Sequence, residues 1–152
     1  MARADGKEGP GELFFSDGWD GYPVARRRLL DVLADDACEN PVVLGGDVHS
    51  FWVADLKQDF DDEHAPTVAS EFVGTSITSA PPPEDRIAAV VRENPHIQYA
   101  TGKYRGYLRL ALTPERLVAD LRAVASVKER ESPCETLASF VVENGRAGPQ
   151  PA

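Results

Sequence analysis

The segment YRGYLRLALTPERLVADLRAV, residues 104–124, decides the fold class. Leu108, Leu110 and Leu112 recur at every second position, which is the period of a strand with one buried face. TPER at 113–116 separates this run from a second apolar run, and a short polar segment with proline favours a tight reversal. We therefore predict a β-hairpin over residues 104–127, with the three leucines on its buried face.

Five further segments are typical of strands, because they are short runs of apolar, β-branched and aromatic residues. They are PVVLGG (41–46), SFWVADL (50–56), TVASEFVGTSITS (67–79, with a bend at Gly74), IQYA (97–100) and LASFVVEN (137–144). The first is expected to be fully buried.

Two segments are typical of helices. In WDGYPVARRRLLDVLADD (19–36), apolar residues recur at helical spacing and Pro23 suits the first turn, while PEDRIAAVVREN (83–94) begins with acidic residues. The apolar positions expected to form the buried face of the first helix are Tyr22, Ala25, Leu29, Leu30 and Leu33.

The order of these elements predicts an α+β fold. About two helices and six or seven strands do not alternate regularly, which favours a largely antiparallel or mixed sheet with helices on one side. The chain has 152 residues, of which 42% are hydrophobic and 27% charged, and this suits one domain with its own core. Residues 145–152, GRAGPQPA, are predicted to be a frayed tail.

The formal net charge of −9 excludes nucleic acid and anionic membrane surfaces as natural partners. No run approaches the ~20 apolar residues that span a bilayer, and the first residues lack the apolar middle of a signal peptide. Cys38 and Cys134 are too few for a disulfide scaffold and are interpreted as packing thiols, although sequence cannot decide whether they pair.

The candidate chemistry lies in VVLGGDVHSFW, residues 42–52. Asp47 and His49 are two apart, so an extended backbone places them on one face at the end of a strand. Gly45 and Gly46 allow the backbone to bend there, and a carboxylate with an imidazole is a workable ligand pair for iron, zinc or manganese. Ser50 could orient the pair or a substrate oxygen.

A plainer interpretation stays open, because aspartate after two glycines is common in turns and a lone histidine near aromatics usually packs. Two ligands also do not close a catalytic metal site. His64 lies in an acidic loop and is predicted to be solvated, whereas His96 stands where a helix gives way to a strand and is expected to pack or to face a pocket.

Taken together, several segments resemble the PhoD-like alkaline phosphatases, a branch of the metallophosphoesterases. GGDVHS after an apolar strand resembles the late metal-binding motif of that family. DGWDGYPVARRRLLDVL upstream, and EFVGTSITS, NPHIQY, YRGYLRLALTPERLVADLRAV and TLASFVVENGR downstream, resemble family segments in the same order. The resemblance extends from about residue 14 to residue 146, with a flexible segment at 1–13 before it and a tail at 147–152 after it.

The resemblance implies the C-terminal half of a four-layer αββα fold and the hydrolysis of phosphate monoesters and diesters with iron and calcium. Asp47 and His49 match the family's metal ligands. The segments that contain Trp19, His96, Arg105 and Tyr107 are family-like, and these side chains are candidates for the substrate side.

The resemblance also implies a missing part, because the family's other metal ligands lie in an N-terminal half that nothing before Asp47 resembles. We expect that half to be the partner of this chain and a phosphate ester to be the substrate. The alternative is a truncated, non-catalytic β-rich module or interaction domain with an incomplete metal site. An extracellular or periplasmic location suits an intact family member, and the sequence leaves the compartment open.

Overall fold

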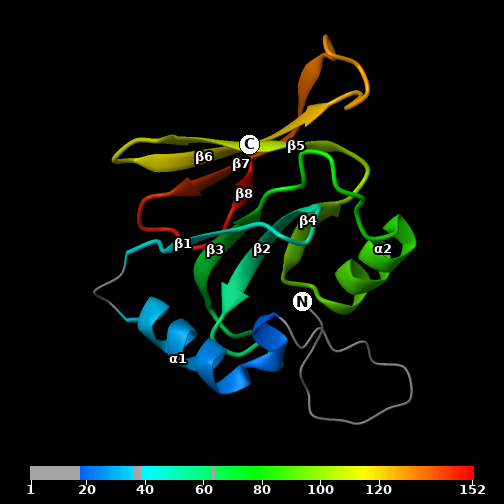
Figure 1. Cartoon of the computed structure of the whole chain (residues 1–152). Helices are drawn as coiled ribbons and strands as arrows, with labels where there is room; N and C mark the ends of the chain where they lie inside the picture. The colour runs from blue at the N-terminus through cyan, green and yellow to red at the C-terminus, as the bar shows by residue number, and fades with distance from the viewer. Residues whose placement is uncertain (1–17, 36–38, 63) are drawn as a thin grey trace, which may run out of the picture.

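Two four-stranded sheets stack face to face in the computed structural model, which describes residues 18–35, 39–62 and 64–152 (Figure 1). The elements in chain order are a 3₁₀ turn η1 (Trp19–Gly21), α1 (Pro23–Leu33), β1 (Val42–Gly45), β2 (Phe51–Lys57), β3 (Thr67–Val73), α2 (Glu84–Glu93), β4 (Ile97–Thr101), β5 (Arg105–Leu112), β6 (Arg116–Val124), β7 (Cys134–Glu143) and β8 (Gln150–Pro151). The predicted flexible segment 1–13 and Cys38 lie outside the described residues.

The first sheet is mixed and has the order β1-β3-β2-β4, with β1 parallel to β3 and the other pairs antiparallel. The second sheet, β5-β6-β7-β8, is antiparallel throughout. The α+β class with mostly antiparallel or mixed pairing is confirmed, and the strands divide between two sheets. Alternation identifies which face of a strand is buried and does not reveal whether a helix or another sheet covers it.

The hairpin that the sequence predicted is confirmed. β5 and β6 pair in register from Arg105 opposite Val124 to Leu112 opposite Leu117. Leu108 packs in the core, but Leu110 is 36% exposed and Leu112 is 77% exposed, so the buried leucine face is wrong for these two. β5 is an edge strand, and the turn end of its hairpin projects past the first sheet (Figure 1).

The core lies between the two sheets. Side chains of β2 and β3 meet side chains of β6 and β7 there, and the buried members of this cluster are Phe51, Val53, Phe72, Ala119, Leu121, Phe140 and Val142. Most of them recur at every second position of their strands, as expected for strands with one face inward. Burying seven such side chains is the main source of stability in the sandwich.

Helix α1 covers the outer face of the first sheet, where Leu30 packs against Leu56 and Ala69. Its buried face is narrower than predicted, because Tyr22 is 59% exposed and Leu29 is 37% exposed. The helix is confirmed, but one residue rather than a full stripe is buried in it.

Strand β1 is confirmed in position but not in burial. It forms an edge of its sheet, and Leu44 is 56% exposed rather than buried. The strand predicted over residues 67–79 ends earlier than expected, since β3 stops at Val73 and Gly74 begins a loop.

The predicted frayed tail is wrong, since β8 pairs with the end of β7. Pro149 is fully buried, and Gly148 adopts a left-handed φ of 92° in the turn that leads to it. A Cβ at Gly148 would lie 2.6 Å from an Asp55 carboxylate oxygen, so both conformation and space require glycine. The sequence did not predict this ordered end, because its composition is polar and rich in glycine.

Helix α2 packs beside β4, with Ile87 as its buried residue. The Glu84 carboxylate accepts a hydrogen bond from the backbone N–H of Gly102, at 2.5 Å, and thereby ties the start of the helix to the end of β4. Among the helices that the structure describes, none is long and apolar enough to cross a membrane.

Candidate functional site

The loop between β1 and β2 carries the Gly-Asp-Val-His motif, and its backbone is bent rather than extended. Asp47 has φ of 72° and His49 has φ of 56°, both in the left-handed region. The amide of Val48 donates to the carbonyl of Gly46 at 2.9 Å, which makes residues 46–48 a γ-turn of the strained kind. The extended backbone expected here is therefore wrong.

The glycines before the motif do not supply the bend. Neither Gly45 nor Gly46 has a positive φ, and the left-handed positions of this loop are Asp47 and His49, the two candidate ligands. For residues other than glycine this conformation costs roughly 1–2 kcal/mol each. Such strain is characteristic of functional sites, where the surrounding structure holds side chains in positions that an unstrained turn cannot reach.

The His49 ring is held in one orientation by the loop that precedes α2. Its Nδ1 lies 3.1 Å from the carbonyl oxygen of Ala80. A carbonyl can only accept, so this contact requires the proton on Nδ1 and leaves the Nε2 lone pair of the neutral ring available. Histidines that bind metals are typically oriented by such a bond from the other ring nitrogen.

Four further hydrogen bonds fix the backbone around His49. The hydroxyl of Thr75 is 3.3 Å from the carbonyl oxygen of His49 and 3.0 Å from that of Tyr104. The fully buried Ser50 donates to the Val48 carbonyl at 3.1 Å and accepts from the indole N–H of Trp52 at 2.7 Å. Ser50 therefore braces the loop and is not free to orient a substrate oxygen.

Asp47 completes the pair of candidate ligands. The residue is exposed, and its carboxylate makes no hydrogen bond or ion pair with any residue that the structure describes. Within residues 18–35, 39–62 and 64–152, no group of three or more His, Cys, Asp or Glu side chains could hold a metal ion. Asp47 and His49 thus offer two donors, and their role as ligands stays a prediction.

His96 and Trp19 lie at the opposite end of β2 from this motif. The carbonyl of His96 accepts from the amide of Asp55 at 2.9 Å, whereas His49 precedes Phe51. Four residues of strand, about 13 Å, separate Phe51 from Asp55. Trp19 begins the turn η1, whose Asp20 pairs with Arg26 on α1.

The His96 ring packs against Phe60 with their centroids 4.7 Å apart, and the Arg26 guanidinium lies 5.5 Å from the Phe60 centroid. Burial lowers the pKa of His96 to about 4, and the positive charges of Lys57 and Arg26 add to this effect. The ring is therefore neutral at pH 7. These contacts favour a packing role. His64, by contrast, is exposed, as predicted.

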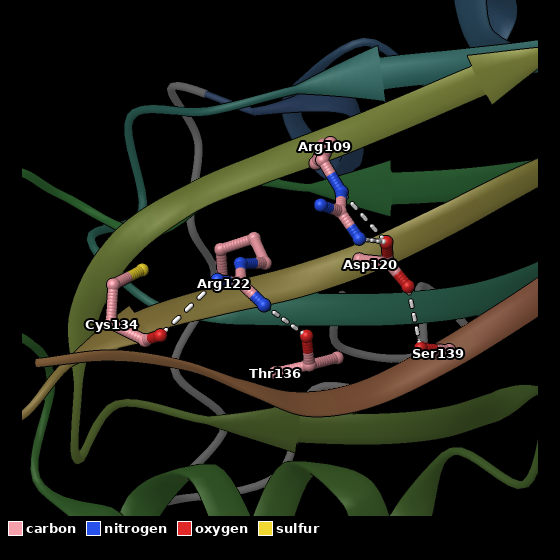
Figure 2. Close-up of polar contacts among 6 residues, drawn as sticks. All are labelled: Arg109, Asp120, Arg122, Cys134, Thr136 and Ser139. Atoms are coloured by element: carbon pink, nitrogen blue, oxygen red, sulfur yellow. Dashed lines mark hydrogen bonds and ion pairs between the residues drawn. The ribbon is translucent and has the colours of Figure 1, made fainter.

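Tyr107 belongs to the outer face of the second sheet, because it stands opposite Arg122 in the register and alternates with the inward Leu108. Figure 2 shows the polar network of this face. Arg109 donates to the Asp120 carboxylate at 2.5 Å, and Ser139 donates to the same carboxylate at 2.6 Å. Arg122 donates to the Thr136 hydroxyl and to the Cys134 carbonyl. The bonds from Ser139 and Arg109 lower the pKa of Asp120.

Cys134 is half-buried at the start of β7 and is a free thiol.

Tyr107 and its network lie on the far side of the sheet from the core and are not brought to Asp47 and His49.

Arg105 is the one predicted substrate-side residue that the structure brings near the motif. Its Nη1 donates to the carbonyls of Gly102 and Tyr104 at 3.1 and 3.3 Å. The Thr75 hydroxyl, which contacts the same Tyr104 carbonyl, links this segment to His49. Thr75 and the Ala80 carbonyl are the groups that sequence reasoning missed, and no local pattern marks either of them.

Comparisons with known proteins agree with the predicted resemblance. A family model described as PhoD-like phosphatase matches residues 1–121. Alkaline phosphatase D of Bacillus subtilis (strain 168) is 40% identical over 139 residues, which cover 90% of this chain and 24% of that protein. A solved structure of PhoD superposes with a TM-score of 0.79 and 39% identity, over 90% of this chain and 26% of that one. The chain thus spans about a quarter of the length of these relatives.

Proposed function

The chain belongs to the PhoD-like phosphatase family, and from this membership we propose that it forms the C-terminal part of a metal-dependent phosphatase. In this proposal the intact protein hydrolyses phosphate monoesters or diesters, and this chain contributes Asp47 and His49 as metal ligands. The observation that carries the assignment is the His49 ring, whose Nδ1 is engaged by the Ala80 carbonyl while Nε2 stays available.

The donor set fits the metals that the family resemblance implies. An imidazole nitrogen suits iron, and a carboxylate oxygen suits both iron and calcium. Hydrogen bonds from Ser50 and Thr75 to the carbonyls of Val48 and His49 fix the backbone of the loop that carries the two side chains. When bound, the metals offset the charge of the phosphate and lower the pKa of a water molecule for attack on phosphorus.

The remaining part of the phosphatase is the proposed partner, and the open side of the sandwich supports this. The edge strands β1 and β5 lie on the same side, since the amide of Gly74 donates to the Gly45 carbonyl at 3.0 Å and a Cβ at Gly74 would lie 3.8 Å from the Leu108 side chain. Leu44 and Leu110 are on the inner faces there and are exposed. Unpaired strand edges beside exposed apolar side chains are typical of surfaces that another segment covers.

A second candidate function is a non-catalytic β-rich module with an incomplete site. The finding that favours it is the ligand count, because the described residues offer two donors where even a simple catalytic metal site needs three. This alternative predicts that the chain folds and shows no turnover with any partner.

Co-expression with an N-terminal segment of a PhoD-like phosphatase tests the proposal. Activity on p-nitrophenyl phosphate and bound iron and calcium should appear in the complex, and each should fall at least about a hundredfold in Asp47→Ala and His49→Ala. Asp31→Ala is the matched control, because Asp31 is an exposed carboxylate on α1. Full activity and metal content in His49→Ala would refute the ligand assignment.

The chain without its partner provides the second comparison. We expect negligible turnover from it, even with iron and calcium supplied. Turnover close to that of a complete phosphatase, if lost in Asp47→Ala, would show that no partner is needed. An inactive complex with normal metal content would favour the non-catalytic module.

A further inference from the structure

A shallow pocket of about 260 Å³ opens between the start of β5 and the turn that joins β6 to β7. The basic residues Lys103, Arg105 and Lys128 line it, together with the hydroxyl-bearing residues Thr78 and Ser126. This volume falls just below the range of roughly 300–1,000 Å³ that is typical of small-molecule pockets. It therefore suits a small charged group rather than a large apolar ligand.

The charge of this pocket is opposite to that of the molecule. The whole chain has 25 Asp and Glu against 16 Lys and Arg, yet three of the nine residues that line the pocket are basic and none is acidic. Three cations gathered in one concave surface repel each other unless an anion lies among them. Lys and Arg with hydroxyl groups are the donors that proteins use for phosphate-type oxyanions.

Arg105 is the basic residue of the pocket whose side chain is held in place. Its Nη1 donates to the carbonyls of Gly102 and Tyr104 at 3.1 and 3.3 Å, which fixes the guanidinium beside the start of β5. A charge fixed in this way needs little further ordering when an anion binds.

The pocket is connected directly to the candidate metal loop. The Thr75 hydroxyl contacts the His49 carbonyl and the Tyr104 carbonyl, and the amide of Gly106 donates to the Ser76 carbonyl at 3.3 Å. Residues 75–78 therefore form a short bridge between Asp47 and His49 on one side and the basic pocket on the other. A ligand with charged groups at both ends could contact the two places together.

We propose that this pocket binds a phosphate-type oxyanion, and that in the assembled phosphatase it holds the second anionic group of the substrate. The inference rests on the proposed function, because the first anionic group is the ester phosphate at Asp47 and His49. The substrate class is then phosphate esters that carry a further phosphate or similar oxyanion. Simple esters with one charged group lose the contacts of Lys103 and Lys128.

Binding is tested first on the full chain, without metal. Inorganic phosphate and inorganic pyrophosphate are titrated in EDTA and low salt while backbone amides are followed by NMR. Saturable shifts are expected at residues 103–106 and 124–128, and pyrophosphate affinity should fall about tenfold in Lys103→Ala/Lys128→Ala. The control Arg27→Ala/Arg28→Ala removes the same charge from exposed positions on α1 and should bind normally.

Absence of shifts at these amides, or an equal loss of affinity in the α1 control, would refute the binding of an oxyanion in this pocket. Far-UV circular dichroism and a thermal melt of each variant show that it is folded. Since the exposed Lys103 and Lys128 side chains pack against little, both variants should melt like the unmodified chain.

A second measurement separates this inference from the proposed function. In the co-expressed complex, kcat/KM for a bisphosphate should exceed that for the matching monophosphate, and Lys103→Ala/Lys128→Ala should reduce that ratio about tenfold. If Asp47→Ala abolishes turnover while the ratio stays unchanged in the lysine variant, the phosphatase proposal stands and the second-anion inference fails. If Asp47→Ala keeps full activity, the ligand assignment fails, while pyrophosphate binding in EDTA still decides the pocket.

Discussion

Acidification should destabilise the protein through His96, because the folded state resists protonation of this ring. Burial, together with the charges of Lys57 and Arg26, lowers the pKa of His96 from 6.5 to about 4. In the unfolded chain the ring is exposed and takes up a proton near pH 6.5. The stability that the neutral ring contributes is therefore complete above pH 6.5 and is lost as the pH falls towards 4.

The magnitude follows from the difference between the two pKa values. At 1.36 kcal/mol per pKa unit, a change from 6.5 to about 4 corresponds to about 3.4 kcal/mol. The ring is only half-buried, so solvent screens part of this effect. We expect the free energy of unfolding to fall by about 2 kcal/mol between pH 7 and pH 4 because of this residue.

Urea denaturation at a series of pH values measures the effect, with His96→Gln as the test variant and His64→Gln as the control. His64 is exposed and outside the Phe60 cluster. Burial raises the pKa of Glu71, so protonation of Glu71 at low pH stabilises the folded chain and opposes the effect of His96. The informative quantity is therefore the difference in the free energy of unfolding between each variant and the unmodified chain. The difference for His96→Gln should change by about 2 kcal/mol and that for His64→Gln by nothing measurable.

An NMR titration of the ring protons gives the pKa of His96 directly. A value near 6.5, or identical pH profiles for both glutamine variants, would refute the packing role argued for this histidine. It would also restore His96 as a candidate for the substrate side.

Three further outcomes concern the sandwich itself. Gly106→Ala should cost about 3 kcal/mol or more in urea denaturation, because its Cβ would lie 1.8 Å from a backbone oxygen of β6, while Gly46→Ala meets no atom within 4 Å and should be nearly neutral. Deleting residues 148–152 should lower the stability by about 2 kcal/mol, since β8 covers the end of β7; an unchanged melting temperature would show that this end is dispensable. Asp120→Ala should cost about 1 kcal/mol, and a double-mutant cycle with Arg109→Ala should recover part of that cost as coupling; additive effects would count against the pair.

The secondary structure could be predicted where local patterns are strong. The alternating run of β5 and the reversal at 113–116 predicted the hairpin, because a period of two residues places the three leucines on one face of the strand. The burial of those leucines was not predictable, since Leu112 is exposed because β5 lies at an edge of its sheet. The ordered end was not predictable either, because residues 145–152 are rich in glycine and proline and carry no alternating pattern, although β8 pairs with the neighbouring strand β7.

The candidate site also has features that could be predicted from the sequence and features that could not. Asp47 and His49 could be identified from residue types, spacing and the resemblance of their surroundings. The left-handed backbone of both residues and the bond from His49 to Ala80, 31 residues away, are invisible in the sequence. Arg105 was one of four substrate-side candidates, and only the Thr75 bridge distinguishes it from His96 and Tyr107.

The sequence by itself determined the family, the order of the elements and the residue types that could bind a metal, because these depend on local composition and spacing. The tertiary structure decided which faces are covered, which histidine has a free nitrogen and which basic residues share a pocket. Those features arise when loops from separate strands meet at one end of a sandwich. Contact between segments far apart in the chain is set by packing, and no single segment encodes it.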